Sequence, residues 1–200
     1  MKINTININD YVKLEKKELD WFFENMFDLK SARRPDLERG ILLYYLCKKH
    51  KVKNALDIGT AGFFSARSMA KSGCHVDTVD IIGSKDPNDG WDNITFIQSD
   101  SNRLLPYLIS EEKEYDLIFI DGSHSYEKAK EDIKYSKMLS NLIVCHDYGN
   151  INNITRAVNE ELSDFDLILG DRMWKGAVYE NGYDREGHKI NYGVVVWENK

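Results

Sequence analysis

The residues best placed to do chemistry are five aspartates, each at or near the end of a short apolar segment. Three of these segments are continuous apolar runs, which are typical of strands buried on both faces of a parallel sheet. The five aspartates are Asp57, Asp80, Asp100, Asp121 and Asp147. An acid gains nothing from burial unless it has a partner, so their recurrence at strand ends indicates a shared binding site.

The elements that must position these acids alternate between strands and helices. Strands are expected at 55–59, 75–79, 94–98, 116–122 and 142–147, and helices at 36–50, 65–72, 126–139 and 154–162. This alternation predicts an α/β fold with a doubly wound, mostly parallel, Rossmann-like sheet and right-handed crossovers. In such a sheet, ligands bind beyond the carboxyl ends of the strands, where the strand order reverses.

The two ends of the chain depart from this alternation. Residues 10–30 have the apolar spacing of an amphipathic helix, which would cover a sheet edge or close over the site. In the tail, apolar segments at 165–169 and 194–197 flank Asn181-Gly182, a tight-turn signal, so we expect an antiparallel C-terminal hairpin. The expected organisation is a single domain over residues 1–200, with a helical extension or lid at 1–35 and an α/β core at 36–200.

Composition narrows the classes of function. The net charge of −6, with lysines and arginines scattered along the chain, disfavours a nucleic-acid partner. The three cysteines are far apart and form no Cys-x-x-Cys pair, which disfavours a disulfide framework and a thiolate zinc site. The sequence contains neither a signal-peptide pattern nor an apolar run of about 20 residues, so we expect a cytoplasmic protein without a membrane partner.

The segment after the first core strand has the composition of a ligand-binding turn. It contains Gly59, Thr60 and Gly62, and glycine lets the backbone approach a ligand closely. Asp80, about 20 residues on, suits the hydroxyls of a ribose. Asp100 can accept a hydrogen bond from an adenine amino group, although it could equally cap a helix. Together these residues predict an adenosine-type ligand.

The sequence resembles the class I S-adenosylmethionine-dependent methyltransferases, and it is most similar to the cation-dependent small-molecule O-methyltransferases of the catechol and macrocin types. The resemblance runs from about residue 36 to the C-terminus and rests on LDIGTAGFFS, the acid at residue 80, FIQSDSNRLLPYL, YDLIFIDGSHSYE and LIVCHDYGN followed by ITRAVNEEL. It implies that residues 57–62, among them Asp57, hold the amino-acid part of the cofactor. It also implies that Asp80 binds the ribose and that Asp100 with Ser101 binds the adenine.

One position departs from the family pattern. Phe63 stands where the family has its second glycine, and Gly62 offers the close approach one residue earlier. We also count Asp121, which ends the strand expected at 116–122, among the expected cofactor-binding residues.

Asp121 and Asp147 are expected to end neighbouring strands about 5 Å apart. Two carboxylates at that distance repel each other unless a proton or a cation lies between them. This favours Mg²⁺, which takes few protein oxygen ligands and keeps its waters. His146, beside Asp147, is a further candidate ligand or supporting donor, and an imidazole also suits Mn²⁺, Fe²⁺ or Zn²⁺. The alternative is that Asp147 is solvated or caps the following helix.

His124 follows Asp121 by three residues, with Gly122 allowing a turn toward the site. A histidine, with an ordinary pKa of about 6.5, can accept a proton near neutral pH. Its position resembles that of the catalytic base in the macrocin-type enzymes. The sequence therefore predicts metal-assisted methyl transfer from S-adenosylmethionine to a hydroxyl of a small molecule, with His124 as the base and homo-oligomerisation left open.

Three other functions were weighed. An NAD-dependent oxidoreductase needs Gly-x-Gly-x-x-Gly, which residues 59–64 do not provide. A nucleic-acid methyltransferase is disfavoured by the acidic charge. A catalytically silent cofactor-binding or scaffold protein of the same fold is favoured by the altered glycine spacing and opposed by the joint presence of Asp121, His124 and Asp147.

Overall fold

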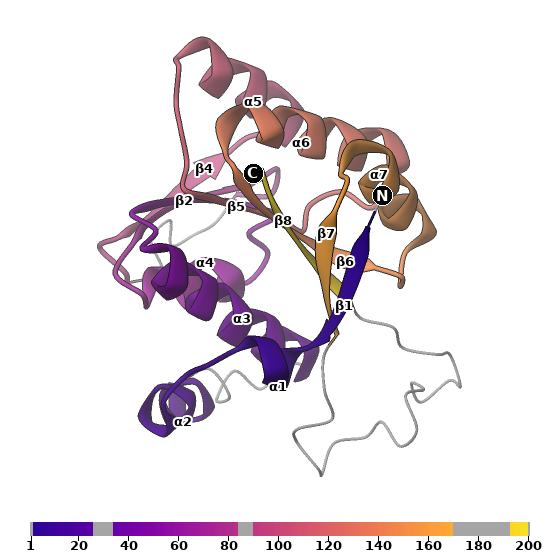
Figure 1. Cartoon of the computed structure of the whole chain (residues 1–200). Helices are drawn as coiled ribbons and strands as arrows, with labels where there is room; N and C mark the ends of the chain where they lie inside the picture. Colours follow the sequence, from indigo (N-terminus) through magenta and orange to yellow (C-terminus); the bar gives the residue numbers. More distant parts are fainter. Residues whose placement is uncertain (1, 26–33, 84–89, 170–192, 200) are drawn as a thin grey trace.

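The computed structural model describes residues 2–25, 34–83, 90–169 and 193–199. Strands and helices alternate along most of this length (Figure 1). The elements are β1 (Ile3–Asn7), α1 (Ile8–Tyr11), α2 (Lys16–Asn25), α3 (Arg34–His50), β2 (Asn54–Ile58), α4 (Phe64–Ala70), β3 (His75–Asp80), β4 (Ile94–Gln98), α5 (Ser101–Ser110), β5 (Leu117–Ile120), α6 (Tyr126–Leu139), β6 (Leu142–Tyr148), α7 (Asn152–Glu161), β7 (Phe165–Leu169) and β8 (Gly193–Glu198).

The described strands form one sheet with the order β1-β7-β8-β6-β5-β2-β3-β4. From β6 to β4 all neighbours are parallel, whereas β8 runs antiparallel to both β6 and β7. The predicted mostly parallel sheet with an antiparallel C-terminal pair is thereby confirmed, although the expected turn at Asn181-Gly182 lies outside the described residues. The strand order reverses at β2, which has β5 on one side and β3 on the other, so a ligand site is expected beyond these strands.

The central strands are buried on both faces, as their continuous apolar runs predict. Along β5, Ile118 and Ile120 belong to the core under α5, α6 and α7, whereas Phe119 belongs to the core under α3 and α4. Figure 1 shows these two groups of helices on opposite faces of the sheet. The sheet edge that carries the aspartates is therefore supported by packed cores above and below it.

The N-terminal segment contains more than the predicted helix. Residues Ile3–Asn7 form an edge strand that pairs in parallel with β7, and helix α2 follows. Phe22 on α2 is fully buried against Ile41, Tyr44 and Phe64, so this helix packs on α3 and α4. None of the described helices is long and apolar enough to cross a bilayer.

Candidate active site

The turn after β2 is tight and contains a position that requires glycine. Gly59 has a φ of +98°, and a Cβ atom there would lie 2.2 Å from the carbonyl oxygen of Asp121. The amide of Gly59 donates to the carbonyl of Val79 at 2.9 Å, and that of Phe63 donates to Thr60 at 2.8 Å. The turn therefore lies directly against the end of β5, which only a glycine at position 59 permits.

Phe63, not Gly62, adopts the glycine-like conformation in this turn. Phe63 has φ 60° and ψ 10°, in the left-handed region that bulky residues rarely occupy. Its ring is buried and lies 5.8 Å from that of Phe96, so core packing offsets the backbone strain. A Cβ atom at Gly62 would meet nothing within 4 Å, and its φ is not positive. The structure thus places the family's second glycine position at Phe63.

Asp57 supports this turn from below. Its Oδ2 accepts hydrogen bonds from Ser65 Oγ at 2.9 Å and Thr78 Oγ1 at 2.7 Å. Thr60 Oγ1 lies 2.6 Å from Thr78 Oγ1, and both Asp57 and Thr60 are buried. Burial raises the pKa of Asp57 to about 7, against the lowering effect of its hydroxyl donors. Asp57 and Thr60 therefore fix the shape of the turn and are enclosed beneath it.

Asp80 ends β3 beside the same turn. Its Oδ2 accepts a hydrogen bond from the amide of Ala61 at 3.1 Å, and its Oδ1 accepts one from the amide of Ile82 at 2.9 Å. The carboxylate is half-buried, and each of its oxygens keeps a second lone pair. Asp80 is thus held rigidly at the rim, where it can still accept hydrogen bonds from a ligand.

Asp100 follows β4 and caps α5. Its Oδ1 accepts from the amide of Asn102 at 3.1 Å, and Lys128 Nζ donates to its Oδ2 at 2.8 Å. The Lys128 ammonium is the main reason that the pKa of Asp100 lies below its usual range. Ser101 begins α5 directly after it, so both predicted adenine-binding residues lie at the end of the strand that neighbours β3.

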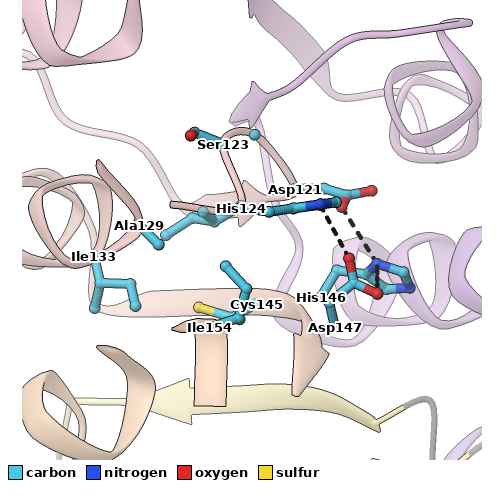
Figure 2. Close-up of a pocket in the computed structure, with 11 residues that line it drawn as sticks. Asp121, Ser123, His124, Ala129, Ile133, Cys145, His146, Asp147 and Ile154 are labelled. Carbon is cyan, nitrogen blue, oxygen red and sulfur yellow. Dashed lines mark ion pairs between the residues drawn. The ribbon is translucent and has the colours of Figure 1, made fainter. Parts of the chain in front are cut away.

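The end of β6 is irregular, and this brings two consecutive side chains to one place. Asp147 has a φ of +61°, and the pairing of β6 with β8 shifts register between Cys145 and Tyr148. His146 Nδ1 lies 3.3 Å from Asp147 Oδ1 and 3.3 Å from Asp121 Oδ1 (Figure 2). In a regular strand, neighbouring side chains would point to opposite faces. The irregularity therefore allows both residues to approach Asp121.

A small pocket lies where the loop after β5 meets the end of β6 (Figure 2). Its polar side is formed by the site residues and its apolar side by residues of α6, β6 and α7. The lining residues are Ile120, Asp121, Gly122, Ser123, His124, Ala129, Ile133, Cys145, His146, Asp147 and Ile154. A ligand here would contact charged groups on one side and aliphatic groups on the other.

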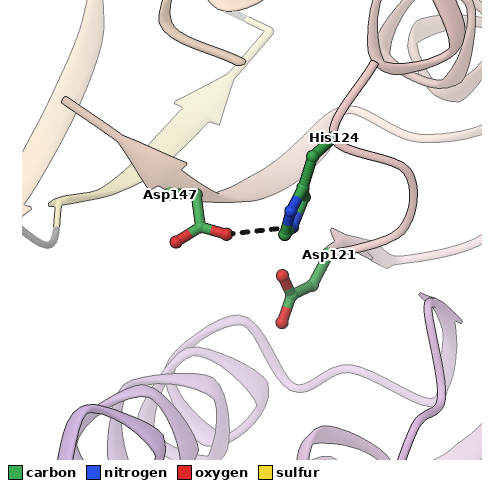
Figure 3. A group of neighbouring side chains, drawn as sticks. All are labelled: Asp121, His124 and Asp147. Atoms are coloured by element: carbon green, nitrogen blue, oxygen red, sulfur yellow. Dashed lines mark ion pairs between the residues drawn. The ribbon is translucent and has the colours of Figure 1, made fainter. Parts of the chain in front are cut away.

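Asp121, His124 and Asp147 converge at the mouth of this pocket (Figure 3). Each offers one ligand atom, and these atoms lie within 4.8 Å of one another. His124 Nε2 is 3.2 Å from Asp147 Oδ2, and the backbone oxygen of His124 accepts a hydrogen bond from Asn153 at 3.2 Å. The two carboxylates fit a divalent cation such as Mg²⁺ or Mn²⁺, and the His124 imidazole lies close enough to serve either as a further ligand or as a base beside the cation. The structure therefore brings the expected base within reach of the expected metal ligands.

The charges at this site are strongly coupled. Burial disfavours a charged His146, but the carboxylates of Asp121 and Asp147 outweigh it and raise the pKa of His146 to about 9. Burial works against ionisation of Asp147 as well, yet His146 holds the pKa of Asp147 below its usual range. At neutral pH the protonated imidazole is therefore the positive charge between two carboxylates, and it must lose its proton before it can ligate a metal.

Arg39 is the site residue that the sequence did not identify. It lies on α3, and its guanidinium forms an ion pair with Asp121 Oδ2. The guanidinium carbon lies 5.7 Å from the centre of the Phe119 ring. Arg39 follows no strand and belongs to no motif, and its partner is 82 residues away in the sequence. No local signal could have indicated this contact.

Comparison with known proteins identifies the fold. A family model described as a methyltransferase domain matches residues 55–148, which span the turn after β2, the four acids predicted to bind the cofactor and the end of β6. The chain has a class I methyltransferase fold. The match confirms the resemblance predicted from the motifs. No curated protein sequence matches the chain.

Solved structures share this methyltransferase fold at low sequence identity. An O-methyltransferase from Bacillus cereus in complex with SAH is 15% identical, with a TM-score of 0.58 over 96% of this chain and 95% of that chain. The O-methyltransferase TomG from Streptomyces achromogenes, involved in tomaymycin synthesis and in complex with SAM, is 15% identical, with a TM-score of 0.59 over 94% and 92% of the two chains. The fold therefore extends over nearly the full length of these enzymes.

Proposed function

We propose that this protein transfers the methyl group of S-adenosylmethionine to a hydroxyl of a small molecule. The observation that carries the proposal is the meeting of Asp121, His124 and Asp147 beside a glycine-containing turn, on the sheet edge where ligands bind in such folds. The complexes of the two O-methyltransferases with SAH and SAM support the choice of cofactor. The proposal takes residues 1–200 as one domain, with residues 1–35 as an extension of the core.

In this proposal the cofactor lies along the edge from β2 to β4. The turn containing Gly59 and Gly62 receives its amino-acid part, and Asp57 and Thr60 hold the turn in shape. Asp80 accepts hydrogen bonds from the ribose hydroxyls, and Asp100 with Ser101 binds the adenine. Asp121, at the end of β5, forms the boundary of the cofactor site on that side.

The acceptor hydroxyl lies over the pocket between β5 and β6. Asp121 and Asp147, with His146 after loss of its proton, would hold a divalent cation there, Mg²⁺ first, which would supply Lewis-acid activation of the hydroxyl. His124 Nε2 would accept the hydroxyl proton as the oxygen bonds to the methyl carbon, and S-adenosylmethionine, when bound, would supply that methyl group and leave as the neutral thioether. Asp147, 3.2 Å from that nitrogen, orients His124 and stabilises its protonated form.

Calorimetric titration with S-adenosylmethionine and with SAH, in the presence and absence of Mg²⁺, tests the proposal. We expect micromolar binding of both, weakened at least about 10-fold in Asp80→Ala, which loses its hydrogen bonds to the ribose. The matched control is Asp77→Asn, because Asp77 lies on the same strand but bonds Tyr115. Its cofactor affinity should equal that of the wild type.

The opposite result has a specific structural cause. If neither ligand binds at millimolar concentration, the left-handed Phe63 closes the turn against the cofactor, and the chain is a catalytically silent protein of this fold. The variant Phe63→Gly tests this cause: it should restore cofactor binding if Phe63 is what blocks the turn. If the wild type binds, Phe63 is compatible with the cofactor. SAH formation with hydroxylated acceptors then distinguishes an enzyme from a silent cofactor-binding protein.

A further inference from the structure

Arg39 places a permanent positive charge beside the proposed cation site. It extends from α3 to the end of β5, where its guanidinium pairs with Asp121 Oδ2. The side chains of Arg39 and Asp121 are only 11% and 18% exposed, so water screens this pair weakly. The approach of the guanidinium to the Phe119 ring gives it a second favourable contact.

Both oxygens of Asp121 are engaged in this arrangement. Arg39 pairs with Oδ2, and His146 Nδ1 lies 3.3 Å from Oδ1. A divalent cation at Asp121 would therefore meet positive charge on both sides of the carboxylate. His146 can give up its charge by losing a proton, but a guanidinium remains protonated at any pH that the protein tolerates. Arg39 can only move away or share the carboxylate.

We propose that Arg39 is an internal counter-cation that competes with the divalent metal for Asp121 and thereby lowers the metal affinity of the site. The inference rests on the cation site of the proposed function and adds a residue that the five strand-end acids do not include. Removal of the guanidinium leaves the Asp121–Asp147 pair with less positive charge, which a metal ion then supplies. Arg39 thus acts through Asp121 as a positioning residue.

Mn²⁺ binding, followed by electron paramagnetic resonance and calorimetry, provides a test that does not depend on turnover. We expect Arg39→Gln to bind Mn²⁺ about 10-fold more tightly than the wild type, because the metal then no longer competes with the guanidinium for the Asp121 carboxylate. Arg39→Lys, which keeps the charge on a more mobile and better hydrated group, should fall between the two. The rank order remains testable with Arg39→Lys if Arg39→Gln does not fold.

Two controls locate the effect. Lys48 lies on the same helix and forms an ion pair with Glu18 away from the site, so Lys48→Gln should leave Mn²⁺ affinity unchanged. Adding Asp121→Asn to Arg39→Gln should abolish the tight binding, because the carboxylate for which the two cations compete is then lost.

The remaining outcomes either overturn the inference, each for a different reason, or support it. Weaker Mn²⁺ binding in Arg39→Gln would mean that Arg39 holds Asp121 in its ligating orientation, and unchanged binding would mean that it does not influence the metal. If neither protein binds Mn²⁺ while both bind S-adenosylmethionine, the cation site and the inference fail but the cofactor proposal stands. If the wild type binds no Mn²⁺ and Arg39→Gln does, the competition is supported in its strongest form.

Discussion

The acids at the ends of β3 and β4 share a sheet edge with those at the ends of β5 and β6, but the two pairs are stabilised differently. Backbone amides of Ala61 and Ile82 hold Asp80, and the amide of Asn102 holds Asp100. By contrast, charged or chargeable side chains surround Asp121 and Asp147, namely those of Arg39, His124 and His146. Amides are fixed donors, whereas side-chain cations can move, lose a proton or be replaced by a metal.

The two regions therefore have different capabilities. The first, which we call the receptacle, comprises the turn after β2 with Asp57 beneath it, Asp80 and Asp100. It is rigid, because its shape depends on backbone geometry. The second is a network of ion pairs among Asp121, Asp147 and the surrounding basic side chains, in which a proton or a cation can be gained or lost. The pKa values follow the partners of each acid: burial raises the pKa of Asp57 to about 7 despite its hydroxyl donors, whereas His146 keeps the pKa of Asp147 low and Lys128 lowers that of Asp100.

Breaking the charge network at His124 should have the largest effect. We expect His124→Ala to slow turnover about 100- to 10,000-fold, equivalent to about 3 to 5 kcal/mol of activation free energy, because the hydroxyl proton loses its acceptor. Cofactor affinity should not change, since the receptacle is intact. The measurement is SAH formation with hydroxylated acceptors, including catechols and sugars, alongside calorimetry.

A matched histidine controls this experiment. His75 Nε2 lies 3.2 Å from Asp77, the same distance as His124 Nε2 from Asp147, but at the start of β3 and away from the site. Turnover in His75→Ala should equal that of the wild type. Equal turnover in His124→Ala would remove the base from the mechanism and leave alignment with the cofactor as the source of catalysis.

The buried Asp57 should make the free energy of unfolding depend on pH. Because the pKa of Asp57 is raised from 3.8 to about 7, the folded protein holds an extra proton between these values, and stability falls as the pH rises through this window. Asp57→Asn has no such loss. The free energy of unfolding of the variant should therefore gain on the wild type by up to about 4 kcal/mol between pH 4 and pH 8. Urea unfolding at both pH values measures the gain, and parallel pH profiles would show that Asp57 ionises freely.

The sequence could predict the elements that have a local signal, and it could not predict those that depend on distant contacts. The strands β2, β5 and β6 were predicted because continuous apolar runs bounded by acids and glycine carry a local signal. The strand β1 was not predicted, because its identity depends on pairing with β7 about 160 residues later. Helix α5 was also missed: Pro106 lies inside it, and proline usually ends or breaks a helix.

At the site, too, only residues with a local signal in the sequence could be predicted. Strand-end position brought Asp121 and Asp147 together in the prediction, since parallel strands end at one edge. The contact of Arg39 with Asp121 depends on how α3 packs over the sheet, which no local pattern specifies. Phe63 was identified as standing at a glycine position of the family, but its left-handed conformation was not predicted, because glycine adopts that conformation most readily and Gly62 is adjacent.

The turn after β2 packs so closely against the end of β5 that position 59 has no room for a side chain, and substitution of Gly59 tests this contact. Gly59→Ala places a Cβ 2.2 Å from the Asp121 carbonyl oxygen at a φ of +98°, so we expect a loss of about 3 kcal/mol of unfolding free energy from overlap and strain together. Gly62→Ala, in open space in the same turn, should change stability by less than about 0.5 kcal/mol. Thermal and urea unfolding of the two variants provide the measurement. Similar losses would show that the turn moves as a unit and that the contact with β5 is not what constrains it.

The smallest effect should follow loss of Lys128, whose ammonium forms an ion pair with Asp100. Its ammonium and the Asp100 carboxylate are 45% and 33% exposed, so water screens the pair and Lys128→Gln should lower the free energy of unfolding only slightly. The amide of Asn102 still caps Asp100, whereas Asp100→Ala removes that cap and should cost about 1 kcal/mol. Urea unfolding compares the variants, and titration by nuclear magnetic resonance should show the pKa of Asp100 rising toward its usual value in Lys128→Gln. A loss as large for Lys128→Gln as for Asp100→Ala would place Asp100 with the acids that depend on side-chain cations, and the rigid receptacle would then be confined to the turn and Asp80.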